Sequence, residues 1–250
     1  MLLPNPWDPG TARLFAHLGF QALATTSSGS AATQGRLDGA LSRDEVLAHC
    51  ADIVRASDLP VSADLENGFA DDPAQVAETV RLAGELGLAG CSIEDCSDGG
   101  AGIYEAGLAA ERVAAAAEAA HGGGAPMVLT ARAENHLRGR QDLADTIARL
   151  QSFQEAGADV AYAPGLRDLE EIRQLVASVD IPVNVLIWHD GPTVADLASR
   201  GVARISVGGN FNLVALGAVT DAAREFLAGG PLGFRETADL GRELRGEAFR

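Results

Sequence analysis

The sequence predicts a single α/β domain, a (β/α)8 TIM barrel over residues 1–250. Two observations carry this prediction: short apolar runs recur along the chain, and amphipathic segments with helix-start signals lie between them. Runs of this kind, rich in Val, Ile, Leu and Ala, are typical of parallel strands buried on both faces. Eight such strands alternating with helices form the pattern of a closed barrel.

The expected strands follow one another at regular intervals. They lie at 1–5, 21–27, 60–66, 90–96, 126–132, 159–165, 182–188 and 203–209. A doubly wound open sheet is the alternative, but such a sheet usually begins with a GxGxxG turn, which this chain lacks. No linker or shift in composition divides the sequence, so we expect one domain with a helical tail after residue 210.

Helix-start signals stand between the runs. Ser42 with Glu45 three residues later is a capping box. Asp72 followed by Pro73 is a cap with proline in the first helical turn, and Asp8 with Pro9 repeats this near the N-terminus. Further helices are expected at 140–157, 166–179 and 193–201, and the tail has a break at 229–233.

Composition narrows the functional classes. A formal net charge of −16 repels nucleic acid and anionic membranes, so neither is an expected partner. Three cysteines without a CxxC pair argue against a disulfide framework and a structural zinc site. No stretch approaches a membrane span and no signal peptide is recognisable. We therefore expect a cytoplasmic protein with a small-molecule substrate.

Polar side chains collect where the expected strands end, which is where barrels place their active sites. Asp64 and Glu66 end the third strand, Glu94 and Asp95 the fourth, and Arg132 the fifth. Strand alternation would put Asp64 and Glu66 on one face. Carboxylates brought together need a cation, and hard oxygen ligands suit Mg2+ or Mn2+. The alternative is that these acids cap the next helix or pair with Arg132.

The same strand ends resemble the isocitrate lyase/phosphoenolpyruvate mutase superfamily. LPVSADLENGF, GCSIEDC and TARAEN stand where members have D-x-D-x-G-[YF], I-E-D and A-R-[TA] segments. The likeness extends over nearly the whole chain, beginning with NPWDPGTARLFAHLGFQALATTSSGS. It implies a Mg2+-dependent barrel that makes or breaks C–C or P–C bonds next to a 2-oxo carboxylate.

The resemblance also implies roles for individual residues. Asp64 would bind the metal directly, and Glu66, Glu94 and Asp38 would complete the metal site, Asp38 through water. Arg132 would bind the substrate's oxyanion. The substrate carboxylate would be held by the turn that contains Thr25, Thr26 and Ser27. Apart from the resemblance, Asn184 on the seventh strand is expected to line the pocket.

One segment departs from the superfamily. Where members carry a mobile K-K-C-G-H loop, this chain reads SDGGAGIYEAGLAAERV, whose glycines suggest a flexible lid. Tyr104 and Glu105 are the obvious proton-transfer candidates there. Cys96 is either a packed thiol or a substitute acid. His189 is either a general acid/base or a plain loop histidine.

The expected function is that of a Mg2+-dependent enzyme for a small 2-oxo or 2-hydroxy (di)carboxylate, acting through an enolate-like intermediate. A C–C lyase is favoured. The alternatives are a P–C mutase or hydrolase of the phosphonopyruvate type and a non-catalytic ligand-binding barrel. The resemblance further implies a homodimer or homotetramer that packs its C-terminal helices between subunits.

Overall fold

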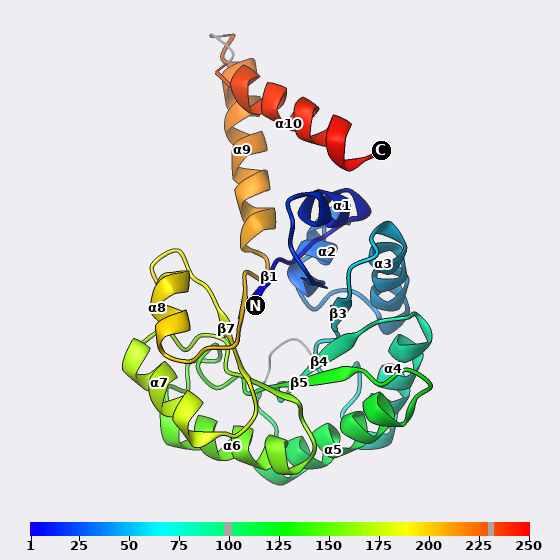
Figure 1. The fold of residues 1–250 in the computed structure, drawn as a ribbon, viewed down its shortest axis with the longest axis vertical. Helices are drawn as coiled ribbons and strands as arrows, with labels where there is room; N and C mark the ends of the chain where they lie inside the picture. The colour runs from blue at the N-terminus through cyan, green and yellow to red at the C-terminus, as the bar shows by residue number, and fades with distance from the viewer. Residues whose placement is uncertain (98–101, 230–232) are drawn as a thin grey trace.

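The computed structural model describes residues 1–97, 102–229 and 233–250. Eight parallel strands form one sheet in the order β1-β8-β7-β6-β5-β4-β3-β2, which curls into a nearly closed barrel (Figure 1). The strands are β1 Leu2–Leu3, β2 Leu23–Ala24, β3 Val61–Asp64, β4 Gly90–Glu94, β5 Val128–Arg132, β6 Val160–Tyr162, β7 Val183–Leu186 and β8 Arg204–Ser206. Each lies inside one of the apolar runs, and the predicted barrel is confirmed.

The first and last strands of this order, β1 and β2, meet across the seam of the barrel. The backbone N–H of Ala24 donates to the carbonyl of Pro4 at 3.0 Å. The side-chain amide of Asn5 donates to the carbonyl of Thr25 at 3.0 Å. These bonds link the two edges, so little strand backbone is left unpaired at the seam.

The described helices lie around the sheet, apart from the two at the C-terminus, which extend away from it (Figure 1). They are α1 Pro9–His17, α2 Ser27–Thr33, α3 Arg43–Ala56, α4 Pro73–Glu85, α5 Ala106–Gly122, α6 Leu143–Glu155, α7 Leu169–Ser178, α8 Val194–Ser199, α9 Asn210–Leu227 and α10 Arg235–Ala248. The three predicted caps are confirmed: Asp8, Ser42 and Asp72 each accept a hydrogen bond from the first turn of the helix that follows.

Two local predictions are corrected. The run at 21–27 was expected to be strand to its end, but β2 stops at Ala24 and Thr26 caps the short helix α2 by accepting from the N–H of Gly29. The expected lid is helical from Ala106 onward. Residues 98–101 of that lid, and residues 230–232 of the expected break in the tail, lie outside the described residues.

The apolar core lies between the strands and the helices, whereas the inside of the barrel is polar. Val61 and Ala63 of β3 are buried, whereas Ser62 and Asp64, which alternate with them, line an inner cavity. TIM barrels usually fill this space with Val, Ile and Leu. Here polar side chains leave a space that a polar ligand can enter.

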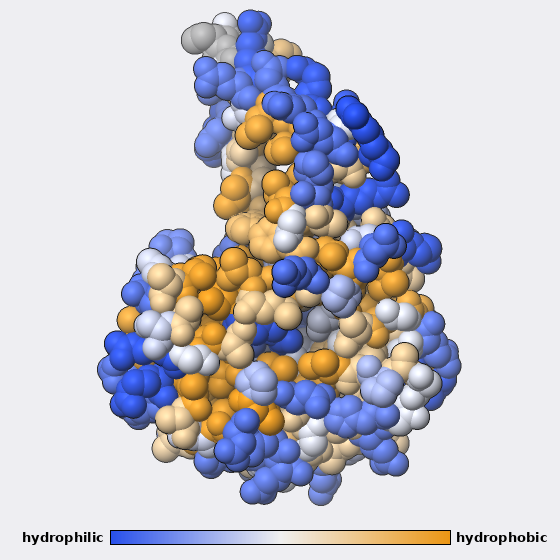
Figure 2. Space-filling model, in the orientation of Figure 1, coloured by the Kyte–Doolittle hydropathy of each residue, from blue (hydrophilic) through white to orange (hydrophobic). Residues whose placement is uncertain are grey.

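The C-terminal helices form an arm. Helix α9 runs away from the barrel and α10 folds back toward α1 (Figure 1), where His17 and Glu247 approach to 3.1 Å. Hydrophobic residues are visible along this arm in Figure 2. Among the described residues, no helix has the length and apolar character needed to cross a membrane.

Candidate active site

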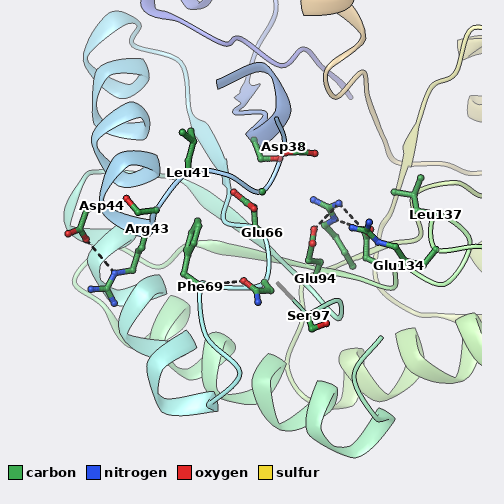
Figure 3. Close-up of a pocket in the computed structure, with 16 residues that line it drawn as sticks. Asp38, Leu41, Arg43, Asp44, Glu66, Phe69, Glu94, Ser97, Glu134 and Leu137 are labelled. Carbon is green, nitrogen blue, oxygen red and sulfur yellow. Dashed lines mark hydrogen bonds and ion pairs between the residues drawn. The ribbon is translucent and has the colours of Figure 1, made fainter. Parts of the chain in front are cut away.

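Two connected cavities lie at the carboxyl ends of the strands. The outer one has a volume of about 700 Å³, and the inner one, about 280 Å³, extends into the barrel. Ser27, Asp38 and Arg132 line both. In Figure 3 the carboxylates of Asp38, Glu66 and Glu94 face the outer space from three different segments.

Arg132, the last residue of β5, stands at the centre of three carboxylates. Its Nη1 lies 3.0 Å from Oδ1 of Asp64, and its Nη2 lies 3.0 Å from Oε2 of Glu94 and 2.7 Å from Oε1 of Glu134. Burial by itself would lower the pKa of Arg132, but these carboxylates raise it well above its usual value. The guanidinium is therefore the cation that holds the acid cluster together.

Two carboxyl groups that line the cavities, those of Glu94 and Asp38, have raised pKa values. Burial raises the pKa of Glu94 to about 8, against the opposing effect of Arg132. Asp38 keeps an exposed surface at the mouth, and partial burial together with the charge of Asp64 still raises its pKa. A raised pKa means that the folded site destabilises the ionised carboxylate, so a bound cation would favour ionisation of these groups.

The end of β2 is tied to the end of β3. The backbone N–H of Ser27 donates to Oδ2 of Asp64 at 3.2 Å, and the N–H of Asp64 donates to the hydroxyl of Thr25 at 2.8 Å. Thr25, Thr26 and Asn184 line the inner cavity. The predicted carboxylate-binding turn thus lies beside the predicted metal ligand.

Glu66 reaches the outer cavity by a route that strand alternation does not describe. β3 ends at Asp64, and Glu66 has a φ of 50° in the turn that follows. Gly68 in the same turn has a φ of 79°, and a Cβ there would lie 2.9 Å from Val76. The predicted common strand face for Asp64 and Glu66 is corrected, because the left-handed turn decides where Glu66 points.

Asp95 is also corrected, since it points away from the mouth. Its Oδ1 accepts from the N–H of Glu134 at 2.8 Å, and its Oδ2 pairs with Arg149 at 3.2 Å. Arg149 donates in turn to the carbonyl of Tyr104 at 2.8 Å. Asp95 is a buried structural acid that joins β4, β5 and α6, and it lines neither cavity.

Among the described residues, the three proton-transfer candidates outside the acid cluster lie away from both cavities. Tyr104 packs on Arg112, with the guanidinium carbon 4.0 Å from the ring centroid, and its hydroxyl donates to Asp71. Burial and this hydrogen bond raise the pKa of Tyr104 to about 12. Glu105 is exposed at the start of α5, and the side chain of His189 is 89% exposed. Their catalytic roles stay predictions.

Sequence reasoning left several lining residues out of the site. Glu134 was given no role, yet its side chain is fully buried against Arg132. Tyr162 and Arg204 were not singled out. The structure places both beside predicted site residues, because the strand register sets Arg132, Tyr162, Asn184 and Arg204 in one row across β5 to β8.

The described carboxyl groups around Arg132 lie close together, but they do not form a metal-binding group in this arrangement. Within residues 1–97, 102–229 and 233–250, no three His, Cys, Asp or Glu side chains form a group that could hold a metal ion as they stand. Arg132 occupies the position between Asp64, Glu94 and Glu134. Cys96 is buried, and its sulfur contacts the carbonyl of Ser97 at 3.6 Å.

Comparison with known proteins gives consistent matches. The family model described as phosphoenolpyruvate phosphomutase matches residues 1–227. Oxaloacetate decarboxylase 2 of Pseudomonas fluorescens (strain Pf0-1) is 30% identical over 226 residues, which cover 88% of this chain and 77% of that protein.

Solved structures agree over almost the whole chain. A Burkholderia cenocepacia J2315 protein named as a lyase/mutase is 51% identical, with a TM-score of 0.93 over 98% of this chain and 89% of that one. A crystal structure of 2,3-dimethylmalate lyase is 26% identical, with a TM-score of 0.85 over 93% and 84% of the two chains.

Proposed function

Because the chain belongs to the isocitrate lyase/phosphoenolpyruvate mutase superfamily, we propose that it is a carbon–carbon lyase for small 2-oxo or 2-hydroxy (di)carboxylates. The observation that carries the proposal is the wall shared by the two cavities, where Arg132 is held among Asp64, Glu94 and Glu134. Relatives named oxaloacetate decarboxylase and 2,3-dimethylmalate lyase support a lyase over the other reactions.

A divalent cation, Mg2+ or Mn2+, fits the chemistry of the donor set. The proposed ligands Asp38, Asp64, Glu66 and Glu94 offer only carboxylate oxygens, and all line the two cavities. Mg2+ usually keeps several waters and needs only one or two carboxylates, so a sparse set of acids is sufficient. When bound, the cation would supply a Lewis acid for negative charge on the substrate's oxygens.

The chain's own residues would orient the substrate and stabilise charge. Thr25, Thr26 and Ser27 would hold the carboxylate next to Asp64. Arg132 would stabilise the negative charge of an enolate-like intermediate. Without a cation, burial raises the pKa of Glu94 to about 8; a bound cation would favour its ionised form, in which it can serve as a ligand.

The test is turnover of a substrate panel. We would incubate the protein and Mg2+ with 2-hydroxy dicarboxylates, oxaloacetate and phosphonopyruvate, and identify products by NMR. Asp64→Asn keeps the size of the side chain but removes its charge, so we expect a loss of at least about 100-fold. Asp44→Asn is the matched control, because exposed Asp44 lines only the outer cavity, beside Arg43.

The outcome separates the candidate functions. Cleavage of a C–C bond that depends on Asp64 supports the lyase. Turnover of phosphonopyruvate alone would favour the P–C mutase or hydrolase, as the description of the matching family model suggests. Binding without turnover of any compound would favour the non-catalytic barrel. Full activity of Asp64→Asn would rule out the proposed metal site.

We also infer a homo-oligomer, a dimer or a tetramer, assembled through the arm of α9 and α10. Of the residues of α9, Asn212 alone is buried, while its exposed apolar side chains include Val214, Val219 and Phe226. A contiguous apolar surface of this kind marks a protein contact. The three cysteines are free and buried, which is compatible with the reducing cytoplasm that we propose as its location.

A further inference from the structure

The inner cavity contains a second guanidinium, that of Arg204. Its Nε donates to Oδ1 of Asn184 at 2.9 Å and its Nη2 to the hydroxyl of Thr130 at 2.7 Å. Both partners are neutral. Within the described parts of the chain Arg204 forms no ion pair, whereas Arg132 is shared by three carboxylates. Arg204 is thus a cation of the cavity wall whose charge no side chain neutralises.

This arrangement is costly for a purely structural residue. An arginine has five N–H donors, and the two hydrogen bonds use two of them. Arg204 is partly buried, and a charge withdrawn from water without a counterion destabilises the folded state. Burial lowers the pKa of Arg204 to about 10, so the group is still charged at neutral pH. A barrel would ordinarily place an apolar side chain here.

The neighbours fix the guanidinium in place. Asn184 accepts from Arg204 through its oxygen and donates through its amide nitrogen to the hydroxyl of Ser206 at 3.0 Å. This second bond sets the orientation of the amide. Thr130 holds the guanidinium from β5, across the barrel from β8. The donors of Arg204 are therefore pre-organised, which lowers the cost of binding an anion.

The cavity continues from the proposed site of reaction. Its wall includes Ser27, Asp38, Asp64 and Arg132 as well as Arg204. A molecule held by one end at Asp64 and Ser27 can therefore place its other end near Arg204. The volume of about 280 Å³ is close to the lower limit of about 300 Å³ for small-ligand pockets, so only a compact molecule fits.

We infer that Arg204 binds a second, distal carboxylate of the substrate and favours molecules that carry this group over shorter ones that cannot reach it. The inference rests on the proposed function for the first end of the molecule. In a chain of net charge −16, a dianion is repelled until it meets unneutralised positive charge. Arg204 supplies that charge within the barrel, and charge-assisted hydrogen bonds to a carboxylate would use donors that its present partners leave unpaired.

The test compares two probes, oxalate and malate, in the presence of Mg2+. If the substrate panel shows that malate is cleaved, its KM takes the place of its dissociation constant. Oxalate is short enough to stay beside Asp64 and Ser27, whereas malate carries a further carboxylate on a longer chain. We would measure both dissociation constants by isothermal titration calorimetry. Arg204→Met should weaken malate at least about tenfold and leave oxalate within about twofold. Arg204→Lys keeps the charge, and malate binding should be intermediate.

Arg43→Met is the matched control for the loss of one positive charge. Arg43 lines only the outer cavity and is paired with Asp44, so both probes should bind to this variant within about twofold of the wild type. If Arg204→Met does not fold, Arg204→Lys decides the question. A Kd for malate equal to that of the wild type, with the same dependence on salt concentration, would then overturn the inference.

The remaining outcomes distinguish this inference from the proposed function. Equal weakening of both probes in Arg204→Met, or an unchanged affinity for malate, overturns the role of Arg204. If the wild type binds malate but not oxalate, the proposed metal site fails, and the loss of malate binding in Arg204→Met still supports the second carboxylate. If the wild type binds neither probe, both proposals fall.

Discussion

At the scale of single residues, the acid cluster brings three carboxyl groups close together, and their mutual repulsion opposes ionisation. Asp64, Glu94 and Glu134 approach one guanidinium, and burial raises the pKa of Glu94 to about 8. A carboxyl whose pKa is higher in the folded than in the unfolded state binds its proton more tightly when folded. This part of the stability is present at low pH and is lost as pH rises toward the folded pKa.

We therefore predict that, without divalent cations, the melting temperature falls between pH 6 and pH 8. The lower limit of this pH window lies at pH 6 to reduce the contribution of Asp95, because burial raises the pKa of Asp95 to about 6. Glu94→Gln should flatten the dependence in this window, because the amide does not titrate. Differential scanning fluorimetry across pH measures the effect, with Glu111→Gln on exposed α5 surface as the control. An equal slope in wild type and Glu94→Gln would contradict the assignment.

Mg2+ should act on the same group. A cation that binds the ionised cluster favours the deprotonated form of Glu94, so saturating Mg2+ should raise the melting temperature more at pH 8 than at pH 6. The same titration with Asp64→Asn should show little stabilisation. A shift that is independent of both pH and Asp64 would indicate that the cation binds elsewhere.

At the scale of elements, the turn between β3 and α4 decides where Glu66 points. Arg112 of α5 is fully buried and donates to three backbone carbonyls: those of Asn67, Ala70 and Glu94. One side chain thus ties the β3–α4 turn to the end of β4. Both segments carry a proposed metal ligand, so the spacing of Glu66 and Glu94 depends on Arg112.

Arg112→Met should lower the free energy of unfolding by about 2–4 kcal/mol, because buried carbonyls lose their donor. We also expect weaker Mg2+ affinity, since the turn that holds Glu66 is no longer tied to β4. Urea unfolding and calorimetry measure the two effects. Arg81→Met is the control, because Arg81 forms only exposed ion pairs on α4. A stability equal to the wild type's would argue against the tie.

Tyr104 is tested by a smaller change at the same place. If its role is to pack on Arg112, Tyr104→Phe keeps the ring and should retain activity within a few-fold, with an unchanged pH profile. If Tyr104 transfers a proton, the variant should lose at least about 100-fold in kcat. Steady-state kinetics on the substrate found in the panel separates these results.

At the scale of the whole molecule, the arm of α9 and α10 carries apolar surface away from the barrel (Figure 2). Val219 and Phe226 are 67% and 71% exposed. A second copy of the chain that covers this face would remove it from water, at a gain of about 25 cal/mol per Å2 buried.

We predict that the double variant Val219→Asp/Phe226→Asp is monomeric, whereas the wild type is a dimer or tetramer. Multi-angle light scattering after size exclusion measures the masses. Gln174→Asp, on the exposed side of α7, adds a charge without touching the arm and should leave the mass unchanged. A monomeric wild type would contradict the proposed assembly.

Local signals were sufficient for most of the fold. Apolar runs, caps such as Ser42 with Glu45, and helix-ending glycines act over a few residues, so the sequence determined eight strands and most helices. It also placed Asp64, Glu94 and Arg132 at strand ends, because parallel strands in a barrel all end at one mouth.

Side-chain direction beyond the strand ends was decided only by the tertiary structure. Glu66 faces the cavity from a left-handed turn, Asp95 turns away to Arg149, and Arg204 reaches across the barrel to Thr130. Each direction depends on partners that are distant in the chain: Arg112 holds the turn of Glu66, and Arg149 comes from α6. Strand alternation describes a residue only while the strand continues, so sequence pattern located the mouth of the barrel, and packing between distant segments set its charges.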